Sequence, residues 1–247
     1  MPDNWRNRRK LPAPKTNYAD PHSTLRLNRS HRISSMPFPQ PLDFGADWPD
    51  AELAVLLCHA HSGSAAGMRD IALTIAVPGV RYILPQAETG HWFPKSLMAP
   101  IEENEPQLSA SLAHYAALIE SLLARGLPLE RIVLGGFGEG ASLTAEFLVR
   151  RPRSYGGAFI LTGGLLDAAT IGRRPGSGLL AVPVYVSGSE TDPDLPIDRV
   201  RGTIRTLQAG GALITSHIFP DRPQMITDGE ITELRRLFEQ VKTAAAA

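Results

Sequence analysis

Hydrophobic runs bounded by turn residues alternate with segments of helical spacing through most of this chain. The runs are rich in Val, Ile and Leu and lack strict alternation of apolar and polar positions, which is typical of strands covered on both faces. We predict six such strands, at residues 52–58, 80–84, 131–135, 157–162, 181–187 and 213–219.

The segments between these runs have the periodicity of amphipathic helices. The clearest helix is predicted at 106–125, where apolar residues recur every three or four positions and Gly126 ends the pattern. Strands alternating with helices of this length favour parallel βαβ units, and therefore an α/β fold of three layers with a mostly parallel central sheet. Ligands of such folds bind at the carboxyl ends of the strands. The remaining helices are expected at 64–76, 139–150, 198–209 and 228–242.

Charge is distributed unevenly, although the whole chain of 247 residues has a net charge of zero. Residues 1–36 contain eight Lys or Arg and two Asp, a net of +6, so the remainder carries 17 basic and 23 acidic side chains, a net of −6. We interpret 1–36 as a disordered basic leader and 37–247 as a single domain. A nucleic-acid-binding arm and a transit-type segment are alternatives for the leader, but we favour an inert or mis-assigned stretch before a start at Met36.

Composition excludes several classes of protein. No apolar run approaches the roughly 20 residues that cross a bilayer, and no apolar segment of a secretory signal follows the basic residues. Cys58 is the only cysteine, so no intramolecular disulfide can form. No dinucleotide-binding glycine motif follows a strand and no P-loop occurs. We therefore expect a cytoplasmic protein with no cofactor and no nucleic-acid or membrane partner.

The segment RIVLGGFGEGASL (131–143) contains the most informative turn of the chain. A hydrophobic strand runs into Gly136-Phe137-Gly138-Glu139-Gly140 and then directly into a helix. This is the layout of a nucleophile elbow, G-x-S-x-G, in which a strained turn lifts the central side chain above the sheet. Here the central residue is Gly138, which has no side chain.

Six segments match, in the same order, the landmarks of one enzyme family. The chain resembles the phospholipase/carboxylesterase family of α/β-hydrolases, relatives of the acyl-protein thioesterases, over roughly residues 40–242. The segments are LLCHAHSGSA (56–65), like the oxyanion loop; WFPKSLMAPIEENEPQL (92–108), like the family's Trp segment; LGGFGEGASL (134–143), like its Gly-Phe-Ser-Gln-Gly-Ala elbow; YGGAFILTGGL (155–165), like the next strand; SETDPDLPIDRV (189–200), like the loop of the triad acid; and IFPDRPQMITDGEI (218–231), like the final loop.

The resemblance places the catalytic triad on a degenerate set of residues. The nucleophile position falls on Gly138, the acid position on Asp192, and the base position on Gln224. Glycine offers no nucleophilic atom, and an amide cannot accept a proton near neutral pH. His217 lies within a predicted strand, seven residues before Gln224, so we do not expect it to replace the base. The resemblance thus implies a hydrolase-fold pseudoenzyme that binds a small ester, acyl or aryl ligand, a protein partner or a second copy, without serine-hydrolase turnover.

The same resemblance implies which residues form the pocket and the oxyanion loop. They are His59, His61, Ser62, Trp92 and Glu139, and the backbone N–H of Glu139 is one candidate oxyanion donor. The loop departs from the family in having Ala60 where a glycine is usual.

Two alternatives use the polar residues around this pocket. The first is an atypical hydrolase, lyase or isomerase in which His61, Glu139 or Asp192 carries the chemistry. The second is a metal site formed by His59 and His61, with His91, Glu139 and Asp192 nearby. No His-Glu-x-x-His or comparable spacing supports a metal. We therefore favour a hydrogen-bonded His59 beneath the loop and a His61 that lines the pocket, and we predict no metal.

Overall fold

The computed structural model describes residues 38–167 and 175–244 of the chain. The predicted leader, 1–36, lies outside these residues. The strands are β1 Leu42–Gly45, β2 Leu53–Cys58, β3 Val80–Leu84, β4 Ile132–Phe137, β5 Gly157–Leu161, β6 Pro183–Ser189 and β7 Leu213–Phe219. The helices are α1 Ala65–Ile75, α2 Gln107–Ala124, α3 Glu139–Arg150, α4 Ile197–Ala209 and α5 Asp228–Ala244, with short 3-10 turns at Trp48–Asp50, Ile101–Asn104, Leu129–Arg131 and Ser177–Leu179.

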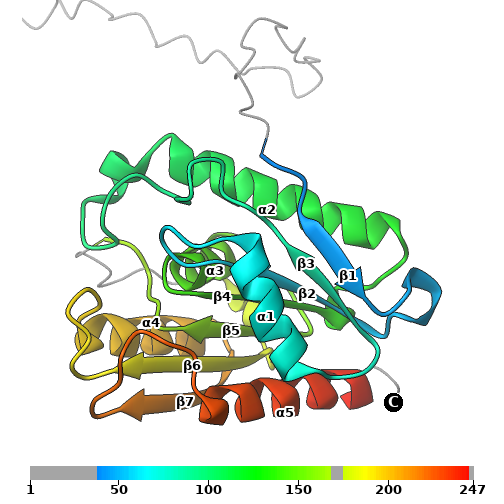
Figure 1. Cartoon of the computed structure of the whole chain (residues 1–247). Coiled ribbons are helices and arrows are strands. Elements are labelled where there is room, and N and C mark those ends of the chain that lie inside the picture. Colours follow the sequence, from blue (N-terminus) through cyan, green and yellow to red (C-terminus); the bar gives the residue numbers. More distant parts are fainter. Residues whose placement is uncertain (1–37, 168–174, 245–247) are drawn as a thin grey trace, which may run out of the picture. The chain divides into compact units, whose positions relative to one another are not determined.

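The strands form one sheet in the order β1-β3-β2-β4-β5-β6-β7 (Figure 1). Every pair of neighbouring strands from β3 to β7 in this order is parallel, which confirms the predicted mostly parallel sheet. All six predicted strands are present, with ends that differ by at most two residues. The prediction omitted β1, which pairs antiparallel with β3 at the edge. This strand has four residues and is largely exposed, so it leaves no hydrophobic run to detect.

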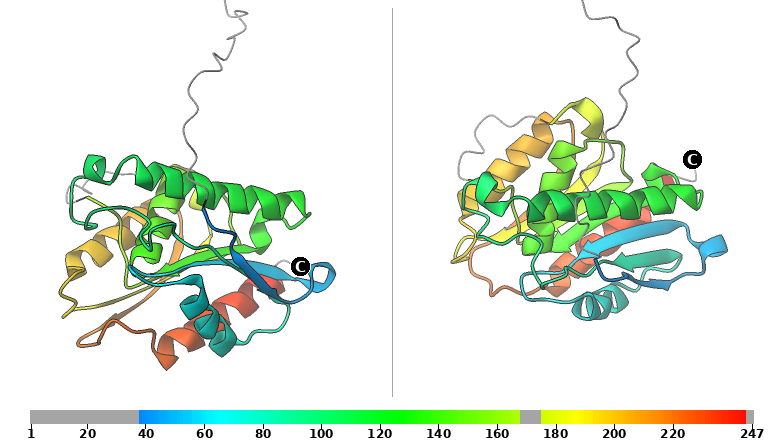
Figure 2. Two further views of the ribbon diagram at one scale, coloured as in Figure 1. Left: turned by 45° about the horizontal axis from the view of Figure 1, so that its top comes forward. Right: turned by 90° about the horizontal axis from the view of Figure 1, so that it is seen from above.

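Helices cover both faces of the sheet, which completes the predicted three layers. Helices α2, α3 and α4 pack on one face, and α1 and α5 pack on the other (Figures 1 and 2). Alternate residues of each central strand enter the two resulting cores. In β2, for example, Leu56 packs in the core beneath the first group of helices and Leu57 in the core beneath the second. Both side chains are fully buried, as the sequence pattern indicated.

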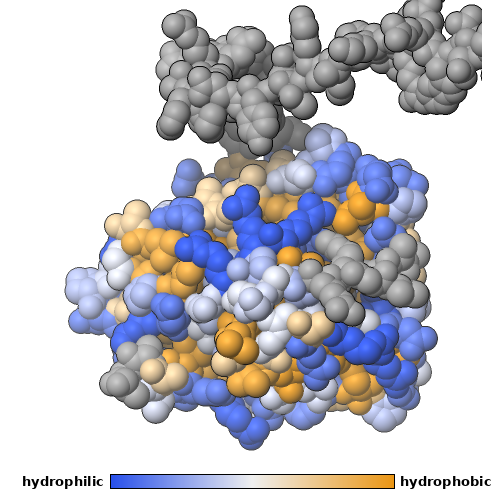
Figure 3. Space-filling model, turned by 180° about the vertical axis from the view of Figure 1, so that it is seen from behind, coloured by the Kyte–Doolittle hydropathy of each residue, from blue (hydrophilic) through white to orange (hydrophobic). Residues whose placement is uncertain are grey.

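On the face opposite to that of Figure 1, hydrophobic residues occur in patches interrupted by hydrophilic ones (Figure 3). Within residues 38–167 and 175–244, none of the helices combines the length and apolar character needed to cross a membrane.

Candidate functional site

A cleft of about 580 Å³ opens where the predicted ligand site lies, at the carboxyl ends of the parallel strands. Ala60 and His61 enter it from the loop after β2, Gly138 from the end of β4, and Thr162 from the end of β5. The loop after β3 adds further lining. Phe93, Leu97, Phe137 and Leu195 contribute apolar surface, and Lys95, Asp194 and Gln224 contribute polar groups.

Gly138 alone connects β4 to α3, and it has φ of 57° and ψ of −118°. This positive φ is one that L side chains rarely adopt. The flanking glycines are required for packing, because a Cβ on Gly136 would lie 2.3 Å from the carbonyl carbon of Gly140. A Cβ on Gly140 would lie 2.4 Å from the backbone oxygen of Cys58. The strand–turn–helix geometry is therefore that of the elbow pattern in the sequence.

The space above Gly138 is partly filled by a residue from another loop. A Cβ built on Gly138 would lie 3.0 Å from the Cβ of Ala60, which is closer than an ordinary van der Waals contact. Ala60 and Gly138 are 78 positions apart in the chain, and each differs from what the family resemblance leads one to expect. The structure brings these two departures into direct contact.

Gln224, which lines the cleft, is hydrogen-bonded to Asp192. The Gln224 Nε2 donates to Asp192 Oδ1 at 3.1 Å and Oδ2 at 3.3 Å, and to Asp194 Oδ2 at 3.3 Å. Asp192 Oδ1 also accepts the backbone N–H groups of Asp194 and Leu195, each at 2.9 Å. The Asp192 carboxylate thus accepts hydrogen bonds from two backbone amides of its own loop and from the side-chain amide of Gln224.

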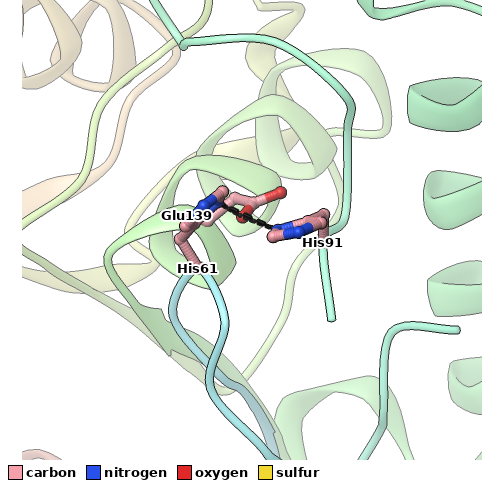
Figure 4. A group of neighbouring side chains, drawn as sticks. All are labelled: His61, His91 and Glu139. Carbon is pink, nitrogen blue, oxygen red and sulfur yellow. Dashed lines mark hydrogen bonds and ion pairs between the residues drawn. The ribbon is translucent and has the colours of Figure 1, made fainter. Parts of the chain in front are cut away.

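A second polar group consists of His61, His91 and Glu139 (Figure 4). It comes from the loops after β2 and β3 and the start of α3, whereas Asp192 and Gln224 follow β6 and β7 on the other side of β5 in the sheet order. Glu139 Oε2 lies 3.0 Å from His61 Nδ1 and 4.0 Å from His91 Nδ1. The two Nδ1 atoms are 3.0 Å apart, and the imidazole ring centroids are 4.1 Å apart with the rings tilted by 32°. Glu139 is held by its other oxygen, Oε1, which accepts the backbone N–H groups of Trp92 at 2.6 Å and Phe93 at 2.9 Å.

His59 and Trp92 lie beneath the cleft and are fully buried. The His59 Nε2 accepts the backbone N–H of Ala87 at 3.0 Å, and its Nδ1 donates to the backbone oxygen of Ala60 at 2.7 Å. Burial lowers the pKa of His59, which favours the neutral ring that this pairing needs. The Trp92 Nε1 donates to the backbone oxygen of His59 at 2.9 Å. These two residues support the loops that carry the cleft.

The structure thus separates the residues that sequence reasoning grouped as pocket or oxyanion loop. His61 and Glu139 line the cleft, whereas His59 and Trp92 support it from below. Ser62 is exposed, with φ of 53°, and its backbone N–H donates to Gly90. Sequence reasoning did not single out the lining residues Lys95, Leu97, Thr162 and Leu195, because loop residues have no periodicity that indicates which way they face.

The parallel sheet, the single-residue elbow and the cleft at the strand ends define an α/β-hydrolase fold. A family model described as Phospholipase/Carboxylesterase matches residues 49–235. The chain belongs to the phospholipase/carboxylesterase family, as the sequence motifs predicted.

Solved structures of other proteins are similar over most of this chain. A phospholipase/carboxylesterase from Dyadobacter fermentans is 31% identical, with a TM-score of 0.76, and the match covers 81% of this chain and 96% of that one. A Bacillus cereus carboxylesterase is 18% identical, with a TM-score of 0.67 and coverage of 81% and 93%. Arabidopsis thaliana SOBER1 is 16% identical, with a TM-score of 0.65 and coverage of 76% and 98%. The last two similarities concern the fold alone.

Proposed function

We propose that this chain binds a small ester, acyl or aryl ligand in the cleft without forming an acyl-serine intermediate. The observation that carries the proposal is the elbow itself, where Gly138 presents no side chain and the methyl group of Ala60 lies against the space that one would occupy. Acyl transfer through a serine needs a hydroxyl at this point.

The Asp192 side of the cleft supports the same proposal. A catalytic base must have a lone pair that accepts a proton near neutral pH. Gln224 instead directs an amide N–H toward both oxygens of Asp192. An amide in this position can hold the loop in place, but it cannot activate a hydroxyl or a water.

The lining of the cleft suits a ligand with an apolar body and a carbonyl group. Phe93, Phe137 and Leu195 offer surface for an aryl or acyl chain. Helix α3 begins at the cleft, and the N–H groups of its first turn have no acceptor within the helix. These groups are suited to donate hydrogen bonds to a carbonyl oxygen, as in an oxyanion hole.

The test has a covalent and a catalytic part. We expect no adduct in the intact mass after incubation with a fluorophosphonate that labels active serines. We also expect p-nitrophenyl butyrate hydrolysis to be unchanged by Ser96→Trp, which places a large side chain in the cleft, and by Ser121→Trp on the exposed part of α2. A labelled protein, or hydrolysis abolished by Ser96→Trp alone, would contradict the proposal.

Ligand binding is tested with a probe that cannot be hydrolysed as an ester. N-phenylbutyramide has the shape of phenyl butyrate but an amide in place of the ester. In calorimetric titrations we expect wild type and Ser121→Trp to bind it equally and Ser96→Trp to bind at least about tenfold more weakly, because the added indole occupies the cleft. Equal affinity in all three proteins would place binding elsewhere and remove this support.

A further inference from the structure

We propose that His61, His91 and Glu139 bind one divalent transition-metal ion, of which Zn²⁺ is the representative, at the rim of the cleft. The site does not depend on the proposed ligand-binding function. It also revises the expectation drawn from the sequence, where the spacing of His59 and His61 gave no reason to predict a metal. The structure replaces His59 with His91 as the partner of His61.

The spacing of the three ligand atoms matches a small metal ion. His61 Nδ1 lies 3.0 Å from His91 Nδ1 and 3.0 Å from Glu139 Oε2, and the third edge of the triangle is 4.0 Å. Ligands of a tetrahedral zinc at bond lengths of about 2.0–2.1 Å lie roughly 3.3 Å from one another. The three distances are compatible with one shared ion, but the imidazole lone pairs lie in the ring planes. The two rings, whose centroids are 4.1 Å apart with a tilt of 32°, must turn about their side-chain torsions for both Nδ1 atoms to point at that ion.

Protons alone leave this triangle poorly satisfied. An imidazole nitrogen carries either a proton or a lone pair, and a carboxylate oxygen carries only lone pairs. If His61 Nδ1 carries a proton, Glu139 Oε2 and His91 Nδ1 must share it. If it carries a lone pair, it lies 3.0 Å from another acceptor, Glu139 Oε2. A cation satisfies all three atoms at once.

The charge of Glu139 points to the same ligand. Its side chain has a relative exposure of 6%, and both ion pairs recorded for it in the described part of the chain are with His61 and His91. A neutral histidine provides no compensating charge, and a buried carboxylate is costly unless it is paired or binds a metal. A divalent ion would supply that charge without requiring either ring to be protonated.

The three ligands are held in place by contacts outside the triangle. The backbone N–H of Ser62 donates to the oxygen of Gly90 at 3.1 Å, which joins the loop of His61 to the loop of His91. The Gln107 side chain donates to the backbone oxygen of His91 at 2.7 Å. Glu139 Oε1 is fixed by two backbone amides, so Oε2 is left facing the histidines. Such supporting hydrogen bonds orient metal ligands.

The ligand set indicates the class of ion. Two imidazoles and one carboxylate suit Zn²⁺ and neighbouring first-row ions better than Mg²⁺ or Ca²⁺, which prefer oxygen ligands. Three protein ligands leave a coordination position free for water or a ligand. Because His61 and Glu139 line the cleft, an ion held by them would lie beside it.

The experiment is a calorimetric titration of the untagged full chain, freed of metal with a chelator, with ZnCl₂. We expect one zinc per chain and an affinity in the micromolar range or tighter. His61→Ala, His91→Ala and Glu139→Gln should each weaken binding by at least about tenfold, since each removes one of three ligands. Glu139→Gln keeps an oxygen for the Trp92 and Phe93 amides, so it tests the ligand without removing their acceptor.

Three control variants make the outcome specific. His217→Ala removes a histidine on β7, and Glu88→Gln removes a carboxylate three residues before His91; we expect neither to change zinc affinity. His22→Ala with His31→Ala removes the two histidines of residues 1–36 and should also leave it unchanged. A zinc concentration of about 100 µM is enough to detect a micromolar site. The proposal would be overturned if the wild type bound no zinc at that concentration, or if binding survived in all three ligand variants. A proton shared within the cluster would then be the remaining explanation.

Discussion

The two polar sides of the cleft differ in how completely their atoms are paired. On one side, the carboxylate of Asp192 accepts N–H groups from Gln224, Asp194 and Leu195. On the other side, two imidazole nitrogens and one carboxylate oxygen meet in the cluster of His61, His91 and Glu139 with too few protons for the contacts they make.

This difference shows where chemistry can occur in the molecule. A carboxylate whose lone pairs are occupied by amides positions a loop and offers little to a ligand. Converging lone pairs attract a proton or a metal cation, so this cluster can still bind an ion supplied from solution. We infer that any ion-dependent behaviour belongs to the His61 side, whereas the Gln224 side is structural.

The largest expected effect comes from rebuilding the triad. We predict that Ala60→Gly, Gly138→Ser and Gln224→His together raise p-nitrophenyl butyrate hydrolysis by about 10³-fold or more, because a complete triad contributes about 10⁶-fold in a serine protease and a rebuilt one should recover part of that. Omitting Ala60→Gly should leave most of this gain unrealised, because a Cβ at position 138 lies 3.0 Å from the alanine methyl. Steady-state kinetics of both variants measure the difference.

The control for this prediction is the same triple variant with Gly138→Ala in place of Gly138→Ser. It has the same steric changes but no hydroxyl, so it should remain at the wild-type rate. A folded triple variant with no gain over this control would show that Gly138 and Gln224 are not the positions of the nucleophile and base.

The next effect concerns the buried ion pair beneath the Gln224 loop. Arg222 Nη1 donates to Glu230 Oε2 at 2.6 Å, and Glu230 also accepts the Ser187 hydroxyl and the Thr227 backbone N–H. We predict that Glu230→Ala lowers the free energy of unfolding by about 3–5 kcal/mol, because it leaves the buried Arg222 guanidinium without the carboxylate that balances its charge. Urea denaturation measures this loss.

The same variant separates the two sides of the cleft. If the Gln224 loop and the cluster of His61, His91 and Glu139 are independent, folded Glu230→Ala should bind zinc with wild-type affinity at low temperature. A parallel loss of zinc affinity would show that the two sides are coupled.

Zinc should also stabilise the protein by mass action. At a free concentration 100 times the dissociation constant, the expected gain is about 2.7 kcal/mol, which corresponds to a rise in melting temperature of about 5–10 °C for a domain of this size. Adding a chelator should reverse it. Differential scanning fluorimetry with and without ZnCl₂ measures the shift. At the same zinc concentration Glu139→Gln should show at most about half of it, since its affinity is at least about tenfold lower. An equal shift in that variant would assign the stabilisation to another site.

The smallest effect is expected for Gln224→Ala. The Gln224 side chain is exposed, and its hydrogen bonds to Asp192 compete with water. We predict a change in the free energy of unfolding within about 0.5 kcal/mol, as for most surface substitutions.

The matched substitution on the other side, Glu139→Ala, should lower the free energy of unfolding by about 1–3 kcal/mol, because the buried N–H groups of Trp92 and Phe93 lose their acceptor. Similar losses in both variants would remove the contrast between the two sides.

Much of the fold followed from the sequence, because burial on a strand or a helix has a period that nearby residues display. The six parallel strands and the five helices were predicted close to their observed bounds. Strand β1 was not, since an exposed edge of four residues depends on its pairing with β3 rather than on its own hydrophobicity. The glycines at 136, 138 and 140 indicated the elbow, because close backbone packing demands them locally.

The sequence by itself determined the fold class, the family and the absence of a hydroxyl at position 138. Only the tertiary structure decided that Ala60 lies against Gly138 and that His61 meets His91 rather than His59. The physical reason is that these contacts join loops from different strands. Their side chains converge because of the order of the strands in the sheet, which no spacing along the chain records.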